Sequence, residues 1–111
     1  MVIGGDIHTF VVADLKADFD DPKAPAVATE FTGTSITSQG LSQKVLEAWR
    51  GENPHIRFGN SQHRGYTSVE LSEKRYVTRL RTVNEKNPDS PVQTLATWVV
   101  EDGRPGAQRE A

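Results

Sequence analysis

The sequence predicts an α+β fold that is mostly antiparallel β, with one short amphipathic helix. Three observations lead to this class: β-prone segments separated by turn residues, a single stretch with helical periodicity, and a length of 111 residues that fits one domain. Hydrophobic residues make up 35% of the chain, so the apolar supply is thin even for one core.

Short strands are expected ahead of the helix. Residues 2–4 predict a short buried strand, residues 9–15 a second strand and residues 26–32 a third. Residues 16–25 are rich in Asp and Pro and predict a surface loop. The run Gly33-Thr34-Ser35 ends the third strand.

The predicted helix covers residues 41–50. Leu41, Val45 and Trp49 recur at spacings of four, while polar residues occupy the opposite face. We interpret Trp49 as the residue that anchors this helix in the core. Gly51 and Pro54 predict the end of the helix.

The rest of the chain predicts an antiparallel meander. Residues 64–71 and 75–84 flank a tight turn, and residues 91–101 follow after a loop. Arginines alternate with Tyr, Thr and Leu in the middle strand, which is typical of a sheet with one wet side. We expect one domain over residues 1–104 and a flexible tail over residues 105–111.

The composition excludes several classes of function. A formal net charge of −2 argues against a nucleic-acid partner or a polybasic membrane contact. No segment approaches the ~20 apolar residues of a membrane span, and no secretory leader precedes the first strand. The absence of cysteine removes disulfides, zinc-thiolate sites and cysteine nucleophiles, and leaves the cellular compartment undetermined.

The first ten residues hold the strongest chemical motif, Gly5-Asp6-Ile7-His8. On extended backbone, Asp6 and His8 would project to the same side, and both are metal-ligand types. Taken by itself, the motif is explained more simply as a strand end with a turn aspartate and a surface histidine.

Several segments nevertheless occur in an order and spacing that resemble one family. They are GGDIHTF, VVADLKADFDDPKAP, VATEFTGTSITS, NPHIRF, RGY and TLATWVVEDGRPG, and they extend from Ile3 to about Gln108. Together they are similar to the C-terminal part of the PhoD-like alkaline phosphatases, which are calcineurin-like metallophosphoesterases. The resemblance implies a metallophosphatase-type β-sandwich flanked by helices, with metal ligands at the ends of strands.

In that family the last ligand block reads Gly-Asp-x-His. The resemblance therefore implies that Asp6 and His8 are metal ligands. It also implies iron and calcium as cofactors, and phosphomonoesters and phosphodiesters as substrates.

The earlier ligand blocks of the family match no residue in this chain. These are an aspartate near the first strand, a Gly-Asp pair followed by a tyrosine, and an Asn-His-Asp or Asn-His-Glu block. We therefore expect a truncated or split protein whose front portion is supplied in cis or in trans. Two ligands cannot hold an ion cluster, so we expect no phosphatase activity from the chain alone, and we identify no catalytic residue within it. Family members are commonly secreted or periplasmic, exported through a twin-arginine leader, whereas the localisation of this chain stays undetermined.

Other polar clusters have simpler explanations. Four acidic residues lack the alternating acids, central Gly and terminal Glu of an EF-hand, so a solvated loop explains them better; they are Asp14, Asp18, Asp20 and Asp21. Four hydroxyl residues lack the Gly-x-Ser-x-Gly elbow of a hydrolase and are better read as strand-end and turn residues; they are Thr34, Ser35, Thr37 and Ser38.

Two histidines and one arginine complete the candidates. His55 and His63 are interpreted as packed or exposed histidines rather than ligands. Arg64 is a candidate substrate-binding residue, because a guanidinium pairs with phosphate through two hydrogen bonds, although a surface ion pair is the simpler reading.

A different class of function stays open. The chain can instead be a non-enzymatic β-rich interaction module, with an apolar face larger than monomers usually expose. Such a module would self-associate into a homo-oligomer or pair with a complementary chain.

Overall fold

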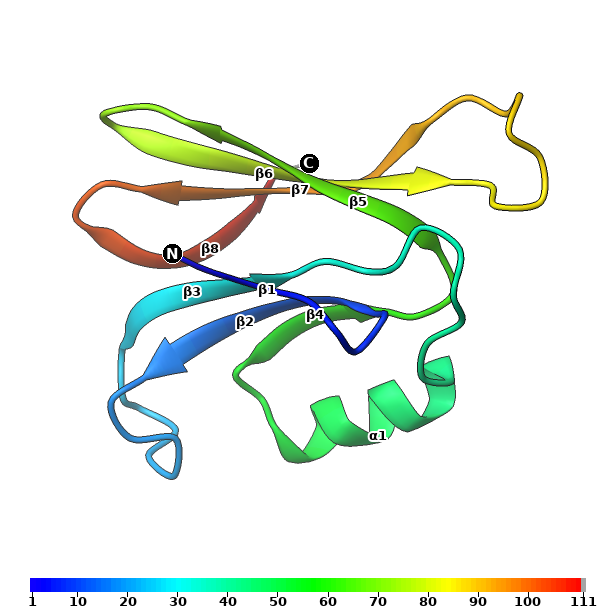
Figure 1. The fold of residues 1–111 in the computed structure, drawn as a ribbon. Coiled ribbons are helices and arrows are strands. Elements are labelled where there is room, and N and C mark those ends of the chain that lie inside the picture. Colours follow the sequence, from blue (N-terminus) through cyan, green and yellow to red (C-terminus); the bar gives the residue numbers. More distant parts are fainter. Residues whose placement is uncertain (111) are drawn as a thin grey trace.

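The computed structural model describes residues 1–110, which form two four-stranded sheets packed face to face with one helix outside (Figure 1). The first sheet has the strand order β1-β3-β2-β4, and the second has the order β5-β6-β7-β8. The strands of the first sheet are β1 (Val2–Gly4), β2 (Phe10–Lys16), β3 (Ala26–Thr32) and β4 (Ile56–Asn60). Those of the second are β5 (Arg64–Leu71), β6 (Arg75–Val83), β7 (Gln93–Glu101) and β8 (Arg104–Glu110).

Strand directions bring three strand ends of the first sheet together. β1 pairs parallel with β3, while β2 pairs antiparallel with both β3 and β4. β1, β3 and β4 therefore run in the same direction, and their carboxyl ends lie at one end of the sandwich (Figure 1). The second sheet is antiparallel throughout. The predicted class, mostly antiparallel β with one short helix, is confirmed.

The core lies between the two sheets. Its buried side chains come from β2 and β3 on one side and from β6, β7 and β8 on the other; they are Phe10, Val12, Phe31, Leu80, Ala96, Trp98, Val100 and Ala107. Aromatic edge contacts join the sheets, with ring centroids 6.0 Å apart for Phe31 and Tyr76 and 6.1 Å apart for Phe58 and Trp98. The buried apolar residues are thus concentrated in a single layer between the two sheets.

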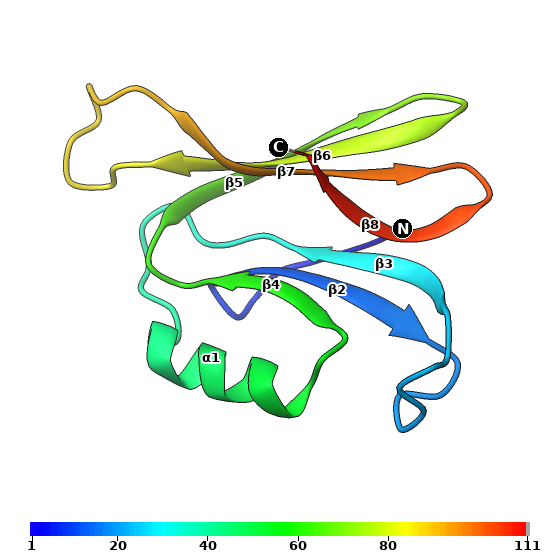
Figure 2. The same cartoon turned by 180° about the vertical axis from the view of Figure 1, so that it is seen from behind.

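The helix α1 (Gln43–Glu52) lies against the outer face of the first sheet (Figure 2). Ser42 caps its first turn by accepting a hydrogen bond from the Val45 amide at 3.2 Å. Leu46 is its buried residue and packs on Gly59 of β4. Trp49 is 46% exposed, so the prediction that it anchors the helix in the core is wrong.

Other sequence predictions also need correction. β1 is a strand as predicted, but all three of its residues are exposed, because it is an edge strand that pairs with β3 alone. The expected flexible tail instead contains β8, which pairs antiparallel with β7 as far as Glu110. Ala111 of that predicted tail lies outside the described residues. β4 was not predicted as a strand.

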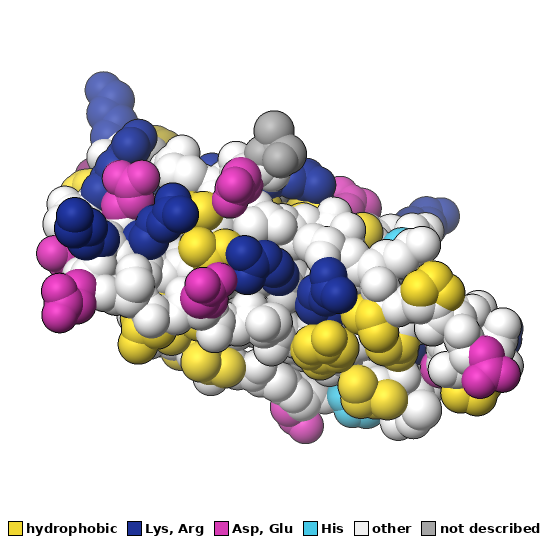
Figure 3. Space-filling model, turned by 90° about the horizontal axis from the view of Figure 1, so that it is seen from above, with side chains coloured by type: hydrophobic (Ala, Val, Ile, Leu, Met, Phe, Trp, Pro, Cys, Tyr) yellow, Lys and Arg dark blue, Asp and Glu magenta, His cyan; other side chains and the backbone are white. Residues whose placement is uncertain are grey.

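The outer face of the second sheet is polar, as the alternation in β6 predicted. Tyr76 and Leu80 pack in the core, whereas Arg79 on the other face forms an ion pair with Glu70 at 3.1 Å. Basic and acidic side chains are intermixed on this surface (Figure 3). The described part of the chain contains no helix that is both long and apolar enough to cross a bilayer.

Tyr76 gives the fold a dependence on alkaline pH. Burial raises the pKa of the Tyr76 phenol above its ordinary value of 10.0. The neutral phenol is thus favoured in the folded state, so its contribution to stability is present below about pH 10 and is lost as the pH rises further. Between pH 9 and pH 11, we expect the urea midpoint of the Tyr76→Phe variant to fall less than that of the parent. The same substitution at the exposed Tyr66 is the control; an identical response of both variants would contradict the prediction.

Candidate functional site

Three loops meet at the end of the sandwich where β1, β3 and β4 terminate (Figure 1). They are the turn at residues 5–9, the loop at residues 33–42 and the link at residues 61–63. Hydrogen bonds tie the second loop to the strands that adjoin the other two, from Gly33 N to Gly4 O of β1 at 3.0 Å and from Gly65 N of β5 to Ser35 O at 2.9 Å. The candidate ligands therefore lie where several segments distant in sequence converge.

The turn that carries Asp6 and His8 has an uncommon backbone. Asp6 has a φ of 79° and His8 a φ of 58°, both in the left-handed region that non-glycine residues seldom adopt. Residues 6–9 form a bend, so the expectation that Asp6 and His8 project from an extended strand is wrong. Asp and His are among the residues that tolerate this region best, but such strain persists only where neighbouring groups hold it.

The imidazole of His8 is held through its Nδ1 atom. Nδ1 lies 3.0 Å from the carbonyl oxygen of Gln39, and the His8 residue is half-buried. Because a carbonyl only accepts hydrogen bonds, this contact assigns the hydrogen to Nδ1. The neutral ring then presents an unprotonated Nε2, which is the state that a metal-ligating histidine needs.

Asp6 is exposed in the same turn and takes part in no ion pair among the described residues. A carboxylate and an imidazole suit a range of transition-metal and hard cations, so the two donor types fit a metal-dependent site. Within residues 1–110, however, no group of three or more His, Cys, Asp or Glu side chains is placed to hold a metal ion. The donor set present is thus of the right kind but incomplete.

Arg64, the first residue of β5, sits behind this turn with only 2% of its surface exposed. Its Nη1 atom faces three oxygens: His8 O at 2.9 Å, Ser35 Oγ at 2.7 Å and Ser38 O at 2.6 Å. Its Nη2 atom donates to Ser61 O at 2.6 Å. The predicted surface ion pair is wrong, because Arg64 is buried and bonds to carbonyl and hydroxyl oxygens. Its substrate-binding role stays a prediction, and a phosphate would have to compete with these contacts.

Close packing reinforces the junction of the three loops. A Cβ atom built on Gly40 would lie 2.1 Å from His8 O, so only glycine fits beside the turn. Thr9, which is fully buried, donates from Oγ1 to Ser61 Oγ at 3.1 Å, and Ser61 Oγ in turn donates to Leu41 O. The backbone around His8 is therefore held by contacts with both of the other loops.

The two remaining histidines lie outside the turn. His55 packs against Phe19, with ring centroids 4.7 Å apart. His63 contacts Asn60 Oδ1 through Nδ1 at 3.1 Å. Both positions agree with packed or surface histidines.

The acidic and hydroxyl clusters also take structural positions. Asp14 pairs with Arg57 at 2.9 Å, while Asp18 and Asp21 accept hydrogen bonds from backbone amides two residues further on. Ser35 Oγ donates to Ser38 O within its loop, as expected of a turn hydroxyl.

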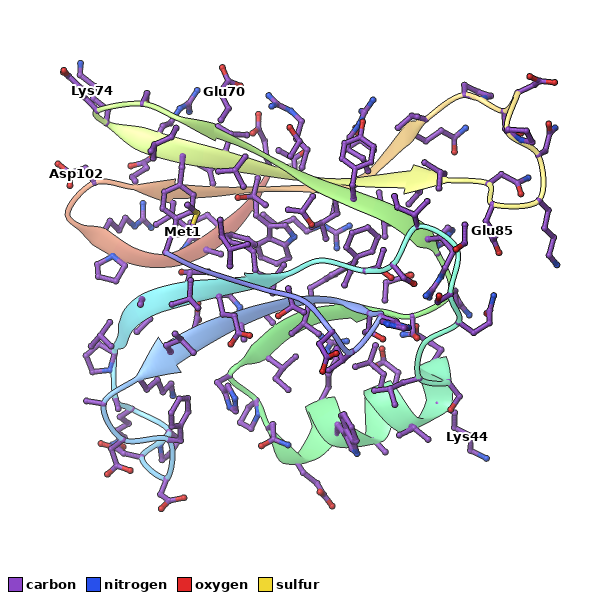
Figure 4. The ribbon with its side chains drawn as sticks, viewed as in Figure 1. Met1, Lys44, Glu70, Lys74, Glu85 and Asp102 are labelled. Atoms are coloured by element: carbon purple, nitrogen blue, oxygen red, sulfur yellow. The ribbon has the colours of Figure 1, made fainter. Side chains whose placement is uncertain are left out.

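A cleft of about 450 Å³ opens at the opposite end of the sandwich, next to the hairpin turns of the second sheet. Met1, Lys74 and Asp102 mark this end, while Glu85 marks the other (Figure 4). Its lining includes Tyr76, Leu71 and Pro105. It also includes the acidic residues Glu73, Glu101 and Asp102, but no histidine that would pair with a carboxylate as His8 pairs with Asp6. We therefore place the candidate site at the Asp6–His8 turn.

Sequence reasoning missed Gln39, Gly40 and Ser61. Gln39 acts through its backbone carbonyl, which leaves no trace in residue type. Gly40 carried a usable signal, because an isolated glycine in a polar loop can mark a close backbone approach.

Comparison with known proteins decides the family. The family model described as "PhoD-like phosphatase" matches residues 1–80 of the chain. The chain belongs to the PhoD-like phosphatase family.

Two known proteins are similar to this PhoD-like chain. The "Alkaline phosphatase D" of Bacillus subtilis (strain 168) is 28% identical over 117 residues, covering 98% of this chain and 19% of the relative. The solved structure titled "Structure of PhoD" superposes with a TM-score of 0.81 at 23% identity, covering 99% of this chain and 22% of that one. The PhoD-like chain thus spans about a fifth of the length of these relatives.

Proposed function

We propose that this chain is the part of a PhoD-like phosphatase that supplies Asp6 and His8 as two ligands of a metal centre for phosphoester hydrolysis. The observation that carries the proposal is the contact between His8 Nδ1 and Gln39 O at 3.0 Å, which leaves Nε2 available as a ligand atom. Asp6 adds an exposed carboxylate from the same turn. Membership of the family supports a metal-dependent role for the turn.

Iron and calcium are the ions we propose, with phosphomonoesters and phosphodiesters as substrates. The Asp6 carboxylate suits a hard cation, and the His8 imidazole suits a transition metal. When bound, such ions lower the pKa of coordinated water and neutralise charge on the transferring phosphoryl group. The chain's own residues position the two ligands: Gln39 O orients the imidazole, and the packing of Gly40 fixes the backbone of His8.

The remaining ligands must come from outside this chain. Residues 1–110 contain no third side chain placed to complete the donor set. A stable catalytic site commonly has about three protein ligands for each ion. We propose that the other part of the phosphatase domain, in cis or in trans, supplies them.

A chimera tests this proposal. The matched region of the Bacillus subtilis alkaline phosphatase D is replaced by this chain, and hydrolysis of p-nitrophenyl phosphate is measured with iron and calcium present. We expect hydrolysis by the chimera and none by the chain alone or by the relative with that region deleted. A folded chimera without hydrolysis would contradict the proposal, as would activity of the isolated chain.

One observation favours the second candidate function, a non-enzymatic interaction module. β1 is an edge strand that pairs with β3 on one side only, its apolar side chains are exposed, and Ile3 is 64% exposed. Trp49 on α1 is also half-exposed. This candidate predicts self-association of the isolated chain, measured by light scattering during size-exclusion chromatography. A monomer over the whole concentration range would count against it.

A further inference from the structure

We propose that Arg64 is a positioning residue that sets the imidazole tautomer of His8 through the backbone. The inference rests on the proposed function only in taking His8 to be a metal ligand. It assigns to Arg64 a role different from direct contact with substrate.

The guanidinium of Arg64 has an unusual environment. Only 2% of the surface of Arg64 is exposed, and its side chain forms no ion pair with a carboxylate among residues 1–110. A buried charge is stabilised only if its donors are satisfied, and here backbone and hydroxyl oxygens do this. The buried guanidinium therefore needs the oxygens of the three loops, and its hydrogen bonds in turn join these loops to one another.

The guanidinium joins the backbone of His8 to that of the loop at residues 33–42. Nη1 donates to His8 O at 2.9 Å and to Ser38 O at 2.6 Å. Ser38 directly precedes Gln39, whose carbonyl oxygen holds His8 Nδ1 at 3.0 Å. One nitrogen thus fixes both the backbone of His8 and the segment that orients its ring.

The shape of the arginine side chain suits this role. A guanidinium is a planar fork, whereas a lysine ammonium is a single point of charge on a flexible stem. Nη2 of Arg64 donates to Ser61 O at 2.6 Å, which locks the plane of the fork relative to the link between the sheets. Lysine at this position would keep the charge but could not hold both directions at once.

The strained turn supports the same role. His8 has a φ of 58°, a conformation that needs external restraint in a non-glycine residue. Arg64 donates a hydrogen bond to its carbonyl, and Gly40 packs closely against the same carbonyl. Loss of the Arg64 bond should let the turn relax, which would separate His8 Nδ1 from Gln39 O.

Imidazole tautomers measured by NMR test the proposal on the chain itself, without metal. Long-range ¹H–¹⁵N correlation spectra are recorded on the ¹⁵N-labelled chain at about pH 8, where imidazoles are neutral. In the parent we expect His8 to carry its hydrogen on Nδ1. In Arg64→Lys we expect its signals to shift toward Nε2–H, while those of His55 stay unchanged.

Two outcomes would overturn the proposal. One is a parent His8 with its hydrogen on Nε2, and the other is a folded Arg64→Lys chain in which His8 stays on Nδ1. If Arg64→Lys does not fold, Arg64→Gln decides instead, because its shorter side chain carries one amide nitrogen and cannot donate to His8 O, Ser38 O and Ser61 O together. A tautomer shift in Arg64→Gln supports the proposal, and an unchanged tautomer overturns it.

The result is separable from the proposed function. The spectra report the link from Arg64 to His8 whether or not His8 binds a metal ion. If the tautomer of His8 does not shift in the Arg64 variant and the chimera is active, only the role of Arg64 is refuted. A tautomer that follows Arg64, together with an inactive chimera, would refute the metal role alone.

Discussion

Asp6→Asn in the chimera with the Bacillus subtilis relative is expected to lower phosphatase activity by more than about 100-fold. Loss of a group that merely orients a metal ligand already costs about 10–100-fold, and Asp6 is proposed as a ligand itself. Asparagine keeps the size of the side chain and tolerates the left-handed backbone that Asp6 adopts at φ 79°. The fold should therefore survive, and the loss should come from the missing negative charge.

Matched controls separate the ligand role from general damage. Asp18→Asn changes an exposed acid of the loop between β2 and β3, and activity should not change. His8→Gln should lose activity as Asp6→Asn does, whereas His55→Gln should not. Iron and calcium content, measured on the purified chimeras, should fall only in the Asp6 and His8 variants. Full metal content and activity in Asp6→Asn would refute the ligand assignment.

Gly65→Ala is expected to destabilise the fold by about 2–6 kcal/mol, because a strained backbone and an overpacked contact each cost roughly 1–3 kcal/mol. Gly65 has a φ of 155°, and a Cβ atom built on it would lie 1.8 Å from the carbonyl oxygen of Arg81. That oxygen belongs to β6, the partner strand of β5, so it cannot move without displacing the sheet. A loss of this size would consume much of the roughly 5–15 kcal/mol that stabilises a typical domain.

Gly51→Ala is the matched control for that substitution. Gly51 lies inside α1, and a Cβ atom built on it meets nothing within 4 Å. Alanine is favoured over glycine in a helix by about 0.5–1 kcal/mol, so this variant should be slightly more stable than the parent. Urea unfolding of both variants measures the difference. Equal stability of the two alanine variants would show that the contact at position 65 relaxes freely.

The helix illustrates what periodicity can and cannot predict. The i, i+4 spacing of Val45 and Trp49 correctly indicated a helix near residues 43–52. It could not show which face meets the sheet, because Gln43 and Arg50 compete for that face by hydrogen bonds to β4 carbonyls. Those polar contacts and the buried Leu46 turn Val45 and Trp49 outward.

Among the strands, too, some features were predicted from the sequence and others were missed. The alternation in β6 was predicted from sequence, because Tyr76 and Leu80 need burial and the arginines do not. β8 was missed because its residues, RPGAQRE, have little strand propensity and follow an Asp-Gly turn. Its strand conformation comes from pairing with β7 and from the complete burial of Ala107, which are tertiary effects.

The candidate site was predictable only in part. Asp6 and His8 stood out because their residue types are those of metal ligands, and family resemblance gave the motif its meaning. The backbone of the turn was not predictable, since Gly40 and Arg64 impose it from distant positions. The buried state of Arg64 was equally hidden, because arginine in a sequence ordinarily indicates a surface residue.

Each layer of the sandwich is built from one continuous half of the polypeptide, residues 2–60 for one and residues 64–110 for the other. The meander of the second half joins neighbours in sequence, whereas β1 with β3 and β2 with β4 join more distant segments. Such local pairings form faster, so the second half should acquire protected amides first during refolding. A nick introduced at 61–63 would yield two pieces whose reassembly amounts to docking between separate subunits.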